Sequence, residues 1–411
     1  MSNSRHDQIE STLARRFGRE TVNYFSGSPL NRLSFLRANN LFLQAALKHP
    51  NTSVLLLKDL APLVQDASKL AYATYDQVRG FIGENPFEKN EEELIKNYNS
   101  SITLPLVLFL GINEHQLEGF EYDVYKGKPY FAVDVTPKGT VKKEASNVIE
   151  PMMAKGLSFI ERHQNLKLSA PEAAIFAQAR ALIDWNSRNQ FCAGCGQSTL
   201  SVNAGSKRVC PPTDYAHLSI ESSKTETFNT PHQRLSCVTR SGISNLSFPR
   251  TDPAIISAVI SHKSDKILLG RQRSWPKNMY STLAGFVEPG ESIEEAVRRE
   301  VWEESGVNLG RVVIHSTQPW PYPANLMIGT ISQALPDGET IHLEFDPELE
   351  DAQWFALNEV REALNVEANL GEIPNGEEEC KGKLRLPPKT AIANTLLRVV
   401  LDELLPEIHK L

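Results

Sequence analysis

The sequence has no apolar run long enough to span a membrane and no strong excess of either charge. Its longest apolar stretch, residues 102–112, is about half of the roughly 20 residues that a membrane-spanning helix needs, so it favours a buried strand. The net charge of −7 provides no general attraction to nucleic acid or to anionic lipid. The polar start, MSNSRHDQIE, lacks the apolar core of a secretory signal, and we expect no membrane partner.

Cysteine is also scarce, with five in 411 residues. Without a secretory signal, this number indicates a reducing compartment, where clustered thiols bind metal more often than they form disulfides. Cys192 and Cys195 form a C-x2-C pair, and Cys210 and Cys237 can complete one site because metal ligands need only to converge in space. Four thiolates suit tetrahedral Zn²⁺ and leave no open position, so the predicted zinc site is structural. His232 is the alternative to Cys237, and Cys380 is left over as an inert thiol.

Composition divides the chain into three regions, which predicts an α+β protein. Residues 1–185 mix strand-like apolar runs with helical segments, and apolar spacing predicts a helix over residues 170–185. Residues 186–245 contain the four cysteines and, at 211–236, a stretch rich in Ser, Thr and Pro that indicates a flexible insertion. Residues 246–411 alternate apolar strands with turns, which favours a layered α/β domain. No internal repeat is visible, and the first region contains no catalytic constellation.

Negative charge is concentrated in one place. Seven glutamates lie in the 23 residues from Gly285 to Val307, GFVEPGESIEEAVRREVWEESGV, which we call the acidic segment. Ser292 followed by Glu295 forms a capping box, which predicts a helix that starts there. Gly306 is placed to end this helix.

Three of these glutamates, Glu300, Glu303 and Glu304, share the apolar side of the predicted helix. Like charges at this spacing destabilise a helix by about a few tenths of a kcal/mol per pair, and by more when they are desolvated. A hard divalent cation such as Mg²⁺ or Mn²⁺ would neutralise them. Arg299 can pair with Glu291 or with Glu303. The alternative interpretation is an acidic helix face that is simply exposed to solvent.

The spacing G-x5-E-x7-R-E-V-x-E-E-x-G-V in the acidic segment resembles a complete Nudix box. The resemblance implies a Nudix hydrolase with an α/β/α sandwich fold, in which a metal clamps a nucleoside diphosphate and activates the attacking water. It implies that Glu300, Glu303 and Glu304 bind the metal, that Arg299 supports them, and that Glu304 assists proton removal from the water. The backbone carbonyl of Ala284 is a further implied metal ligand.

Other motifs resemble those of NADH pyrophosphatases, one branch of that family. TQPWPYPANLM, residues 317–327, is similar to the SQPWPFPxS signature of the branch, and FCAGCG, FPRTDPAII and LPPKTAIANTLL resemble its remaining motifs. Glu348 matches an acidic metal ligand of the branch. The alternative interpretation of residues 317–327 is a proline-rich surface loop. The alternative interpretation of Phe286 is an aromatic residue of the core. The implied dinucleotide contacts are Phe248, Phe286, Gln318, Pro319, Trp320, Pro321, Tyr322, Pro323, Ala324, Asn325 and Ala393.

On this resemblance we predict a homodimeric NADH pyrophosphatase. It would cleave NADH, and less readily NAD⁺, into AMP and nicotinamide mononucleotide with Mg²⁺ or Mn²⁺, and the branch also implies removal of NAD caps from RNA. The rival hypotheses are a Nudix hydrolase of ADP-ribose or another nucleoside diphosphate derivative, and a zinc-ribbon binding or scaffold protein with an inactive Nudix fold. The last three residues, His409, Lys410 and Leu411, resemble a peroxisomal address read by an import receptor; otherwise we expect a cytoplasmic protein.

Overall fold

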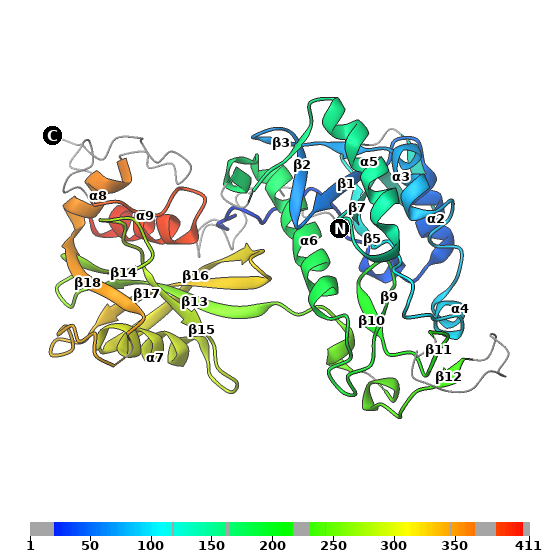
Figure 1. The fold of residues 1–411 in the computed structure, drawn as a ribbon. Coiled ribbons are helices and arrows are strands. Elements are labelled where there is room, and N and C mark those ends of the chain that lie inside the picture. The colour runs from blue at the N-terminus through cyan, green and yellow to red at the C-terminus, as the bar shows by residue number, and fades with distance from the viewer. Residues whose placement is uncertain are drawn as a thin grey trace. The chain divides into compact units, whose positions relative to one another are not determined.

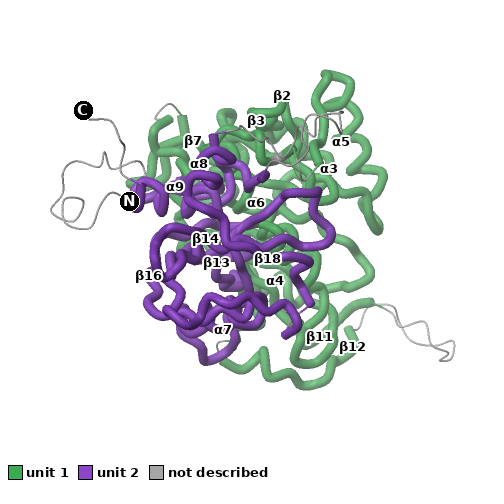
Figure 2. Tube along the Cα trace, turned by 90° about the vertical axis from the view of Figure 1, so that its left-hand side faces the viewer, with its two compact units in different colours: residues 1–5, 28–250, 321–323 green, residues 6–27, 251–320, 324–411 purple. Residues whose placement is uncertain are grey.

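The computed structural model describes residues 20–116, 119–161, 164–216, 231–242, 244–345, 347–365 and 384–405. Contacts within the chain define two compact units, which are coloured separately in Figure 2. Unit 1 comprises residues 28–250 and 321–323, and unit 2 comprises residues 20–27, 251–320 and 324–405. None of the described helices combines the length and the apolar character that crossing a bilayer requires.

Unit 1 is built around an eight-stranded sheet whose main path runs β3-β2-β1-β7-β5 (Figure 1). The parallel pair β1 and β7 lies at its centre, and residues 54–57 and 131–133 of this pair are 0% exposed. Uninterrupted apolar runs of this kind are typical of strands that are covered on both faces. The strands are β1 (Ser53–Lys58), β2 (Ala61–Asp66), β3 (Lys69–Leu70), β4 (Tyr72–Ala73), β5 (Val107–Asn113), β6 (Phe120–Tyr122), β7 (Tyr125–Asp134) and β8 (Ser158–Phe159).

Helices cover this sheet. Apolar side chains of α2, α3 and α5 share one buried cluster with alternate residues of the central strands. The predicted helix at residues 170–185 is confirmed as α6, and its Gln178 donates a hydrogen bond to the Leu110 carbonyl of β5 at 2.9 Å. The helices of unit 1 are α2 (Asn40–Lys48), α3 (Tyr75–Ile82), α4 (Glu91–Lys96), α5 (Lys142–Ala154) and α6 (Ala170–Arg188), with 3-10 turns at Ser34–Leu36, Gly139–Val141, Gln164–Lys167, Val238–Arg240 and Asn245–Ser247.

The cysteine-rich part of unit 1 consists of two short ribbons. Antiparallel β9 pairs with β10, and antiparallel β11 pairs with β12. Few apolar side chains are buried here, so the ribbons depend on other interactions for their stability. Their strands are β9 (Leu200–Val202), β10 (Lys207–Val209), β11 (Thr213–Asp214) and β12 (His232–Gln233).

Unit 2 is a six-stranded sheet with the order β16-β17-β13-β14-β18 and with β15 paired to β13. Ile255 and Val259 of β13 pack in one apolar cluster with α7, whereas Ile256 and Ala258 pack in another with α8 and α9. Because side chains alternate across a strand, the sheet lies between two helical layers, which confirms the α/β/α arrangement. The elements are β13 (Asp252–Ile260), β14 (Lys266–Gln272), β15 (Leu283–Phe286), β16 (Leu309–Trp320), β17 (Asn325–Ala334), β18 (Leu349–Ala356), α7 (Ile293–Ser305), α8 (Leu357–Asn365) and α9 (Ile392–Leu404).

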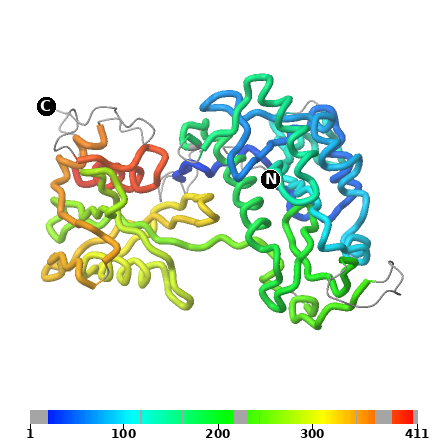
Figure 3. Tube along the Cα trace, viewed as in Figure 1, coloured from blue at the N-terminus to red at the C-terminus, as the bar shows by residue number. Residues whose placement is uncertain are grey.

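The first described residues, 20–27, lie along β16 of unit 2 (Figure 3, dark blue beside yellow). Asn23 Nδ2 donates a hydrogen bond to Ser316 Oγ at 3.0 Å. The Phe25 ring meets the Trp320 ring edge-on, with centroids 5.8 Å apart. The start of the chain therefore helps to fix the strand that carries the QPWPYP motif.

The two sheets repeat one topology, which corrects the expectation that the chain has no internal repeat. In unit 1, β1 pairs antiparallel with β2 and β4 and parallel with β7, and β7 pairs antiparallel with β5. In unit 2, β13 pairs antiparallel with β14 and β15 and parallel with β17, and β17 pairs antiparallel with β16. In both, a helix with a capping box follows the short strand, at Thr74 for α3 and at Ser292 for α7. Strand pairing requires only apolar residues of suitable size, so the repeat leaves little trace in the sequence.

Candidate active site

The acidic segment forms the helix that the sequence predicts. Ser292 Oγ accepts a hydrogen bond from the Glu295 N–H at 3.3 Å, and the Glu295 carboxylate accepts one from the Ser292 N–H at 2.7 Å. The helix α7 ends at Ser305, and Gly306 follows in the left-handed region with φ 74°, which favours glycine. Glu304 lies on the buried side of α7 and is 3% exposed.

Strand β15 brings Gly285 against the side chain of Glu300. A Cβ atom at residue 285 would lie 2.0 Å from the Glu300 Cδ, far closer than van der Waals contact allows. Only glycine therefore leaves room for this carboxylate. This contact gives a physical reason for the glycine that opens the acidic segment.

Arg299 holds three carboxylates at once. Its Nε and Nη2 donate hydrogen bonds to Glu291 Oε1 and Oε2 at 2.6 and 2.9 Å, and its Nη1 donates to Glu300 Oε1 and to Glu303 Oε2 at 2.9 Å each. The hydrogen bonds from Arg299 lower the pKa of Glu291 to about 2. The sequence predicts a pair with Glu291 or with Glu303, and Arg299 makes both pairs.

Glu300 is the carboxylate of this group most affected by burial. Burial raises its pKa, the Arg299 guanidinium opposes that shift, and the negative charges of Glu303 and Glu348 add to it. A divalent cation would stabilise the charged form of these mutually repelling acids. Because every donor in the group is an oxygen, the residues fit Mg²⁺ or Mn²⁺.

Glu348 is held by Gln272, a residue that no sequence motif singled out. Gln272 Nε2, at the end of β14, donates a hydrogen bond to Glu348 Oε1 at 2.8 Å. Glu350 forms a separate ion pair with Arg271 at 2.9 Å. Glu348, rather than Glu350, therefore acts electrostatically on the acidic segment.

The glutamates are not gathered as closely as the ligands of a closed metal site. Among the described residues, only the four cysteines form a group of at least three candidate ligands whose atoms all lie within 4.8 Å of one another. The hydrogen bonds of Arg299 explain the looser arrangement, because they draw Glu300 and Glu303 toward the guanidinium. The following groups therefore remain predicted, rather than observed, ligands of the divalent metal: Glu300, Glu303, Glu304, Glu348 and the carbonyl of Ala284.

Two aromatic side chains that were predicted to contact the dinucleotide are exposed. Phe286 is 58% exposed, which excludes the alternative of a core aromatic, and Phe248 is 42% exposed. The Phe286 carbonyl accepts a hydrogen bond from Arg299 Nη2 at 2.8 Å. Arg299 therefore fixes the backbone that carries this ring as well as the carboxylates.

Gln318 makes several contacts within the fold, and its contact with the dinucleotide stays a prediction. It is 1% exposed, its Oε1 accepts from the Ile392 N–H at 2.9 Å, and its Nε2 donates to the carbonyls of Thr390 and Tyr24 at 2.9 and 3.0 Å. The amide is thus used to join three separate segments of unit 2. Ala393 is likewise 2% exposed and packs in the apolar cluster of α9, so its methyl group serves the core.

The ends of β16 and β17 keep the remaining residues of this motif in register. Pro319 lies opposite Leu326, and Trp320 lies opposite Asn325, so this part of the motif belongs to the sheet rather than to a loop. Asn325 Oδ1 is buried and accepts no hydrogen bond from the described residues. A buried acceptor is costly unless a ligand or water satisfies it, which supports a ligand contact for Asn325.

Residues 321–323 belong to unit 1, where Arg180 of α6 contacts them. Arg180 Nη1 donates a hydrogen bond to the Pro321 carbonyl, and the guanidinium carbon lies 4.5 Å from the centroid of the Tyr322 ring. This distance suits a cation–π interaction. No sequence signal distinguishes Arg180 from other helical arginines. All the dinucleotide contacts implied by the motifs stay predictions: Phe248, Phe286, Gln318, Pro319, Trp320, Pro321, Tyr322, Pro323, Ala324, Asn325 and Ala393.

The four predicted zinc ligands converge in unit 1. The Sγ atoms of Cys192 and Cys237 are 3.5 Å apart, and those of Cys195 and Cys210 are also 3.5 Å apart. Four buried or half-buried thiols at this spacing fit a tetrahedral Zn²⁺. His232 lies on the exposed strand β12 outside the group, which favours Cys237 as the fourth ligand.

A short ribbon and an arginine compensate for the insertion between Cys210 and Cys237. The pairing of Asp214 with His232 brings the two ends of the insertion together. Arg240 Nε donates to the Cys210 carbonyl at 2.8 Å, and its Nη2 lies 3.3 Å from the Cys210 Sγ. No sequence signal pointed to Arg240. Parts of three predictions lie outside the described residues, namely 217–230 of the insertion, Cys380, and residues 409–411.

Comparison with known families matches consecutive parts of the chain. An NADH pyrophosphatase-like rudimentary NUDIX domain matches residues 51–185, an NADH pyrophosphatase zinc ribbon domain matches residues 187–218, and a NUDIX domain matches residues 251–373. The first and last of these matches agree with the topology that the two units share.

Similar proteins cover nearly the whole chain. The chain is 35% identical to an NAD-capped RNA hydrolase of Schizosaccharomyces pombe, across 94% of this chain and 95% of that protein. It is 33% identical to the NAD-capped RNA hydrolase NUDT12 of Homo sapiens, across 92% of this chain and 73% of that protein. It is also 35% identical to the mitochondrial NAD(P)H pyrophosphatase NUDT13 of Mus musculus, across 66% and 67%. The similarity therefore extends well beyond the acidic segment.

Proposed function

This chain belongs to the Nudix hydrolase family, in its NADH pyrophosphatase branch, and we propose that it hydrolyses the diphosphate of NADH and NAD⁺ to AMP and nicotinamide mononucleotide. The same bond occurs in the NAD cap of RNA. Two of the similar proteins are named as NAD-capped RNA hydrolases, which supports capped RNA as a further substrate.

The contacts of Arg299 are the observation that carries this proposal. One guanidinium binds three carboxylates of the acidic segment and also the carbonyl of Phe286, whose ring is exposed. Metal-binding groups and an aromatic surface for a base are thereby fixed relative to each other. This is the combination that a dinucleotide with a central diphosphate requires, because its rings and its phosphates must be held together.

The residues of the site divide the work of hydrolysis. A bound divalent metal would neutralise the diphosphate and activate the attacking water. Glu300, Glu303, Glu304, Glu348 and the carbonyl of Ala284 would hold the metal, and we propose Mg²⁺ or Mn²⁺ for this role. Glu304, buried beside them, accepts the proton of the water, and Phe286 orients the nicotinamide ring by stacking on it.

Two features of the assembly belong to the same proposal. Zn²⁺ bound by the four cysteines would stabilise the two ribbons, which bury few apolar side chains. We also propose a homodimer, which sedimentation equilibrium would distinguish from a monomer of 45.9 kDa. Import into peroxisomes through residues 409–411 stays a prediction, and replacing Leu411 in a fluorescent fusion would test it.

Product analysis of the purified protein tests the function. NADH, NAD⁺, ADP-ribose and NAD-capped RNA are each incubated with Mg²⁺ or Mn²⁺, and the nucleotides released are separated by chromatography. We expect AMP and reduced nicotinamide mononucleotide from NADH, at a higher kcat/KM than for ADP-ribose. A preference for ADP-ribose would support the rival hydrolase, and no turnover of any substrate would support the scaffold hypothesis.

A further inference from the structure

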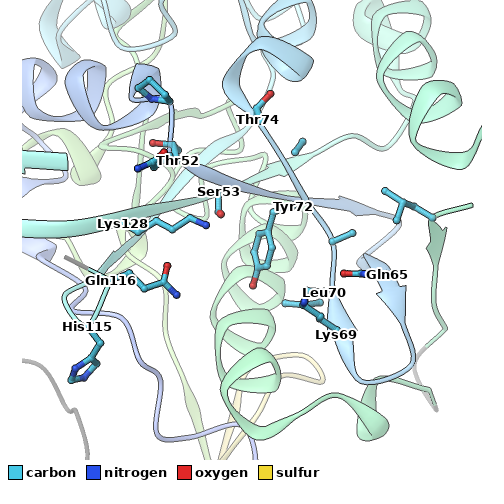
Figure 4. A pocket seen from close by; sticks show the side chains of 15 residues that line it. Thr52, Ser53, Gln65, Lys69, Leu70, Tyr72, Thr74, His115, Gln116 and Lys128 are labelled. Carbon is cyan, nitrogen blue, oxygen red and sulfur yellow. The ribbon is translucent and has the colours of Figure 1, made fainter. Parts of the chain in front are cut away.

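Unit 1 contains a cavity of about 1010 Å³ that the proposed reaction does not use (Figure 4). It is lined by the start of β1, by β3 and β4, and by residues just after β5 and near the start of β7. Protein sites for small molecules typically have volumes of roughly 300–1,000 Å³, so the cavity has room for a nucleotide.

The cavity occupies the same place in the repeated topology as the predicted dinucleotide contacts of unit 2. Strand β1 corresponds to β13, the short strand β4 corresponds to β15, and the connection from β5 to β7 corresponds to the β16–β17 connection. In unit 2, β15 carries Gly285 and Phe286, and the ends of β16 and β17 carry the QPWPYP motif. The cavity of unit 1 therefore lies at the strand ends that correspond to those carrying the predicted contacts in unit 2.

The helix beside this cavity cannot support hydrolysis in the way proposed for α7. Ile82 is the eighth residue after the capping residue Thr74, which is the position that Glu300 holds relative to Ser292. The helix α3 ends at this residue and buries Val78, Phe81 and Ile82. A ligand of this cavity would thus be bound without being cleaved.

The lining is positively charged although the chain as a whole carries −7. Lys69 and Lys128 are among its fifteen residues, and none of the fifteen is acidic. Neither lysine forms an ion pair with another described residue, and the Lys128 Nζ lies 5.6 Å from the centroid of the Tyr130 ring. The charges of Glu172 and, for Lys69, of Asp66 act on these lysines from outside the lining. Two ammonium groups in a cavity whose own lining has no carboxylate still favour an anionic ligand.

Neutral polar groups complete the lining. Figure 4 shows Ser53, Gln116 and the two lysines around the ring of Tyr72. The Tyr72 hydroxyl donates to Glu172 Oε2 at 3.0 Å, and this oxygen also accepts from the Leu70 N–H at 3.1 Å. Glu172 is not a lining residue, and it holds the Tyr72 ring in place. The two hydrogen bonds that its carboxylate accepts reduce the repulsion between this carboxylate and an anionic ligand.

We propose that this cavity is a non-catalytic binding site for a nucleoside 5′-phosphate, with Lys69 and Lys128 binding the phosphate and Ser53 and Gln116 offering hydrogen bonds. The ligand is either a free mononucleotide or the 5′-phosphorylated end of an RNA, which share this chemistry. Binding here does not depend on hydrolysis in unit 2, so failure of the proposed function would leave this proposal standing.

Calorimetric titration with AMP, in buffer without divalent cations, tests the site on the full-length protein. Lys69→Ala combined with Lys128→Ala removes both ammonium groups. Lys126→Ala is the matched control, because Lys126 lies on the same strand, pairs with Glu121 at 2.9 Å and does not line the cavity. We expect wild type and the control to bind one AMP per chain and the double variant to bind it roughly tenfold or more weakly. Thermal unfolding checks that all three proteins are folded.

Competition experiments identify the ligand chemistry and its source. Inorganic phosphate should displace AMP, whereas adenosine should not. A 5′-phosphorylated trinucleotide that competes better than AMP identifies an RNA end as the ligand, and weaker competition identifies the free nucleotide. The proposal is overturned if the double variant binds AMP as tightly as wild type, if wild type binds none, or if adenosine competes as well as AMP.

Discussion

Two helices in equivalent positions of a repeated fold have opposite properties. In unit 2, α7 has 13 residues and carries Glu300, Glu303 and Glu304 beside the glycine of β15. In unit 1, α3 has eight residues and presents only apolar side chains to its core. The strand pairings are the same, so the fold does not determine the chemistry. We expect catalysis to depend on these few acidic residues and on the one position without a Cβ atom.

The largest expected effect comes from removing the charge of one buried acid. Replacing Glu304 with Gln should lower kcat for NADH on the order of 10³-fold, because the site loses both a metal ligand and its proton acceptor. Steady-state hydrolysis at saturating metal measures this loss. Glu304 is 3% exposed and α7 packs on the sheet, so the circular dichroism spectrum should stay unchanged.

The matched control for this change is Glu294→Gln on the same helix. Its side chain makes no hydrogen bond among those found in the described residues and lies in the first turn, away from Glu304. We expect kcat within about twofold of wild type, since the substitution removes one surface charge. An equal loss in both variants would mean that total negative charge, rather than position, sets the activity.

Gly285→Ala tests the close approach that distinguishes β15. The added Cβ would lie 2.0 Å from the Glu300 Cδ, so the carboxylate must move by more than an ångström or the strand must shift. Displacement of this size in an active site lowers rates by about 10²-fold. Metal titration of NADH hydrolysis should show a higher half-saturating concentration of Mg²⁺. A metal affinity equal to that of wild type would show that Gly285 is not needed to position Glu300 for metal binding.

Local signals explain what was predictable from the sequence. The caps at Ser292 and Gly306 act within one helical turn, so the bounds of α7 followed from a few neighbouring residues. The fold contacts of Gln318 were not predictable in this way, because its partners, Tyr24 and Thr390, lie 294 and 72 residues away. A sequence motif shows that a particular residue is needed at a position. It does not show whether that residue contacts the substrate or stabilises the fold.

Long-range contacts also hid the residues that support the site. Gln272 reaches Glu348 across 76 residues, and Arg240 reaches Cys210 across 30 residues and an insertion. The repeat in unit 1 leaves little trace in the sequence for a related reason. Apolar alternation builds the same sheet with many different side chains, so only the strand pairings reveal it.

A smaller effect should come from the ion pairs of the two helices. Arg299 pairs with three carboxylates in unit 2, whereas Arg79 of α3 has Asp76, at 3.7 Å on the surface, as its one ion-pair partner among the described residues. Glu291→Gln should lower kcat about tenfold by loosening Arg299. The control Asp76→Asn should leave both activity and stability unchanged, as exposed pairs contribute little.

The pH dependence of stability provides a second measurement on the Glu291 variant. The folded-state pKa of Glu291 is about 2, below its usual 4.5, so its contribution is present above pH 4.5 and is lost as pH falls toward 2. In denaturant titrations, wild type should therefore be more stable than Glu291→Gln at pH 5. The difference should shrink steadily at lower pH. A difference that grows as the pH falls would contradict this assignment.

The smallest expected effect tests whether α3 is free of catalytic constraint. A Cβ at Gly80, inside this helix, would meet no atom within 4 Å. Gly80→Ala should therefore raise the free energy of unfolding of unit 1 by about 0.5–1 kcal/mol, because glycine loses more backbone entropy in a helix.

Gly83 is the matched control: it also has open space but adopts φ 85°, so Gly83→Ala should destabilise by about 1–3 kcal/mol. NADH turnover should stay unchanged in the Gly80 variant, whereas the Gly-to-Ala exchange at Gly285 should lower it by about 10²-fold. If Gly80→Ala lowers turnover, α3 takes part in the reaction, and the distinction between a catalytic and a purely binding copy of the fold is wrong.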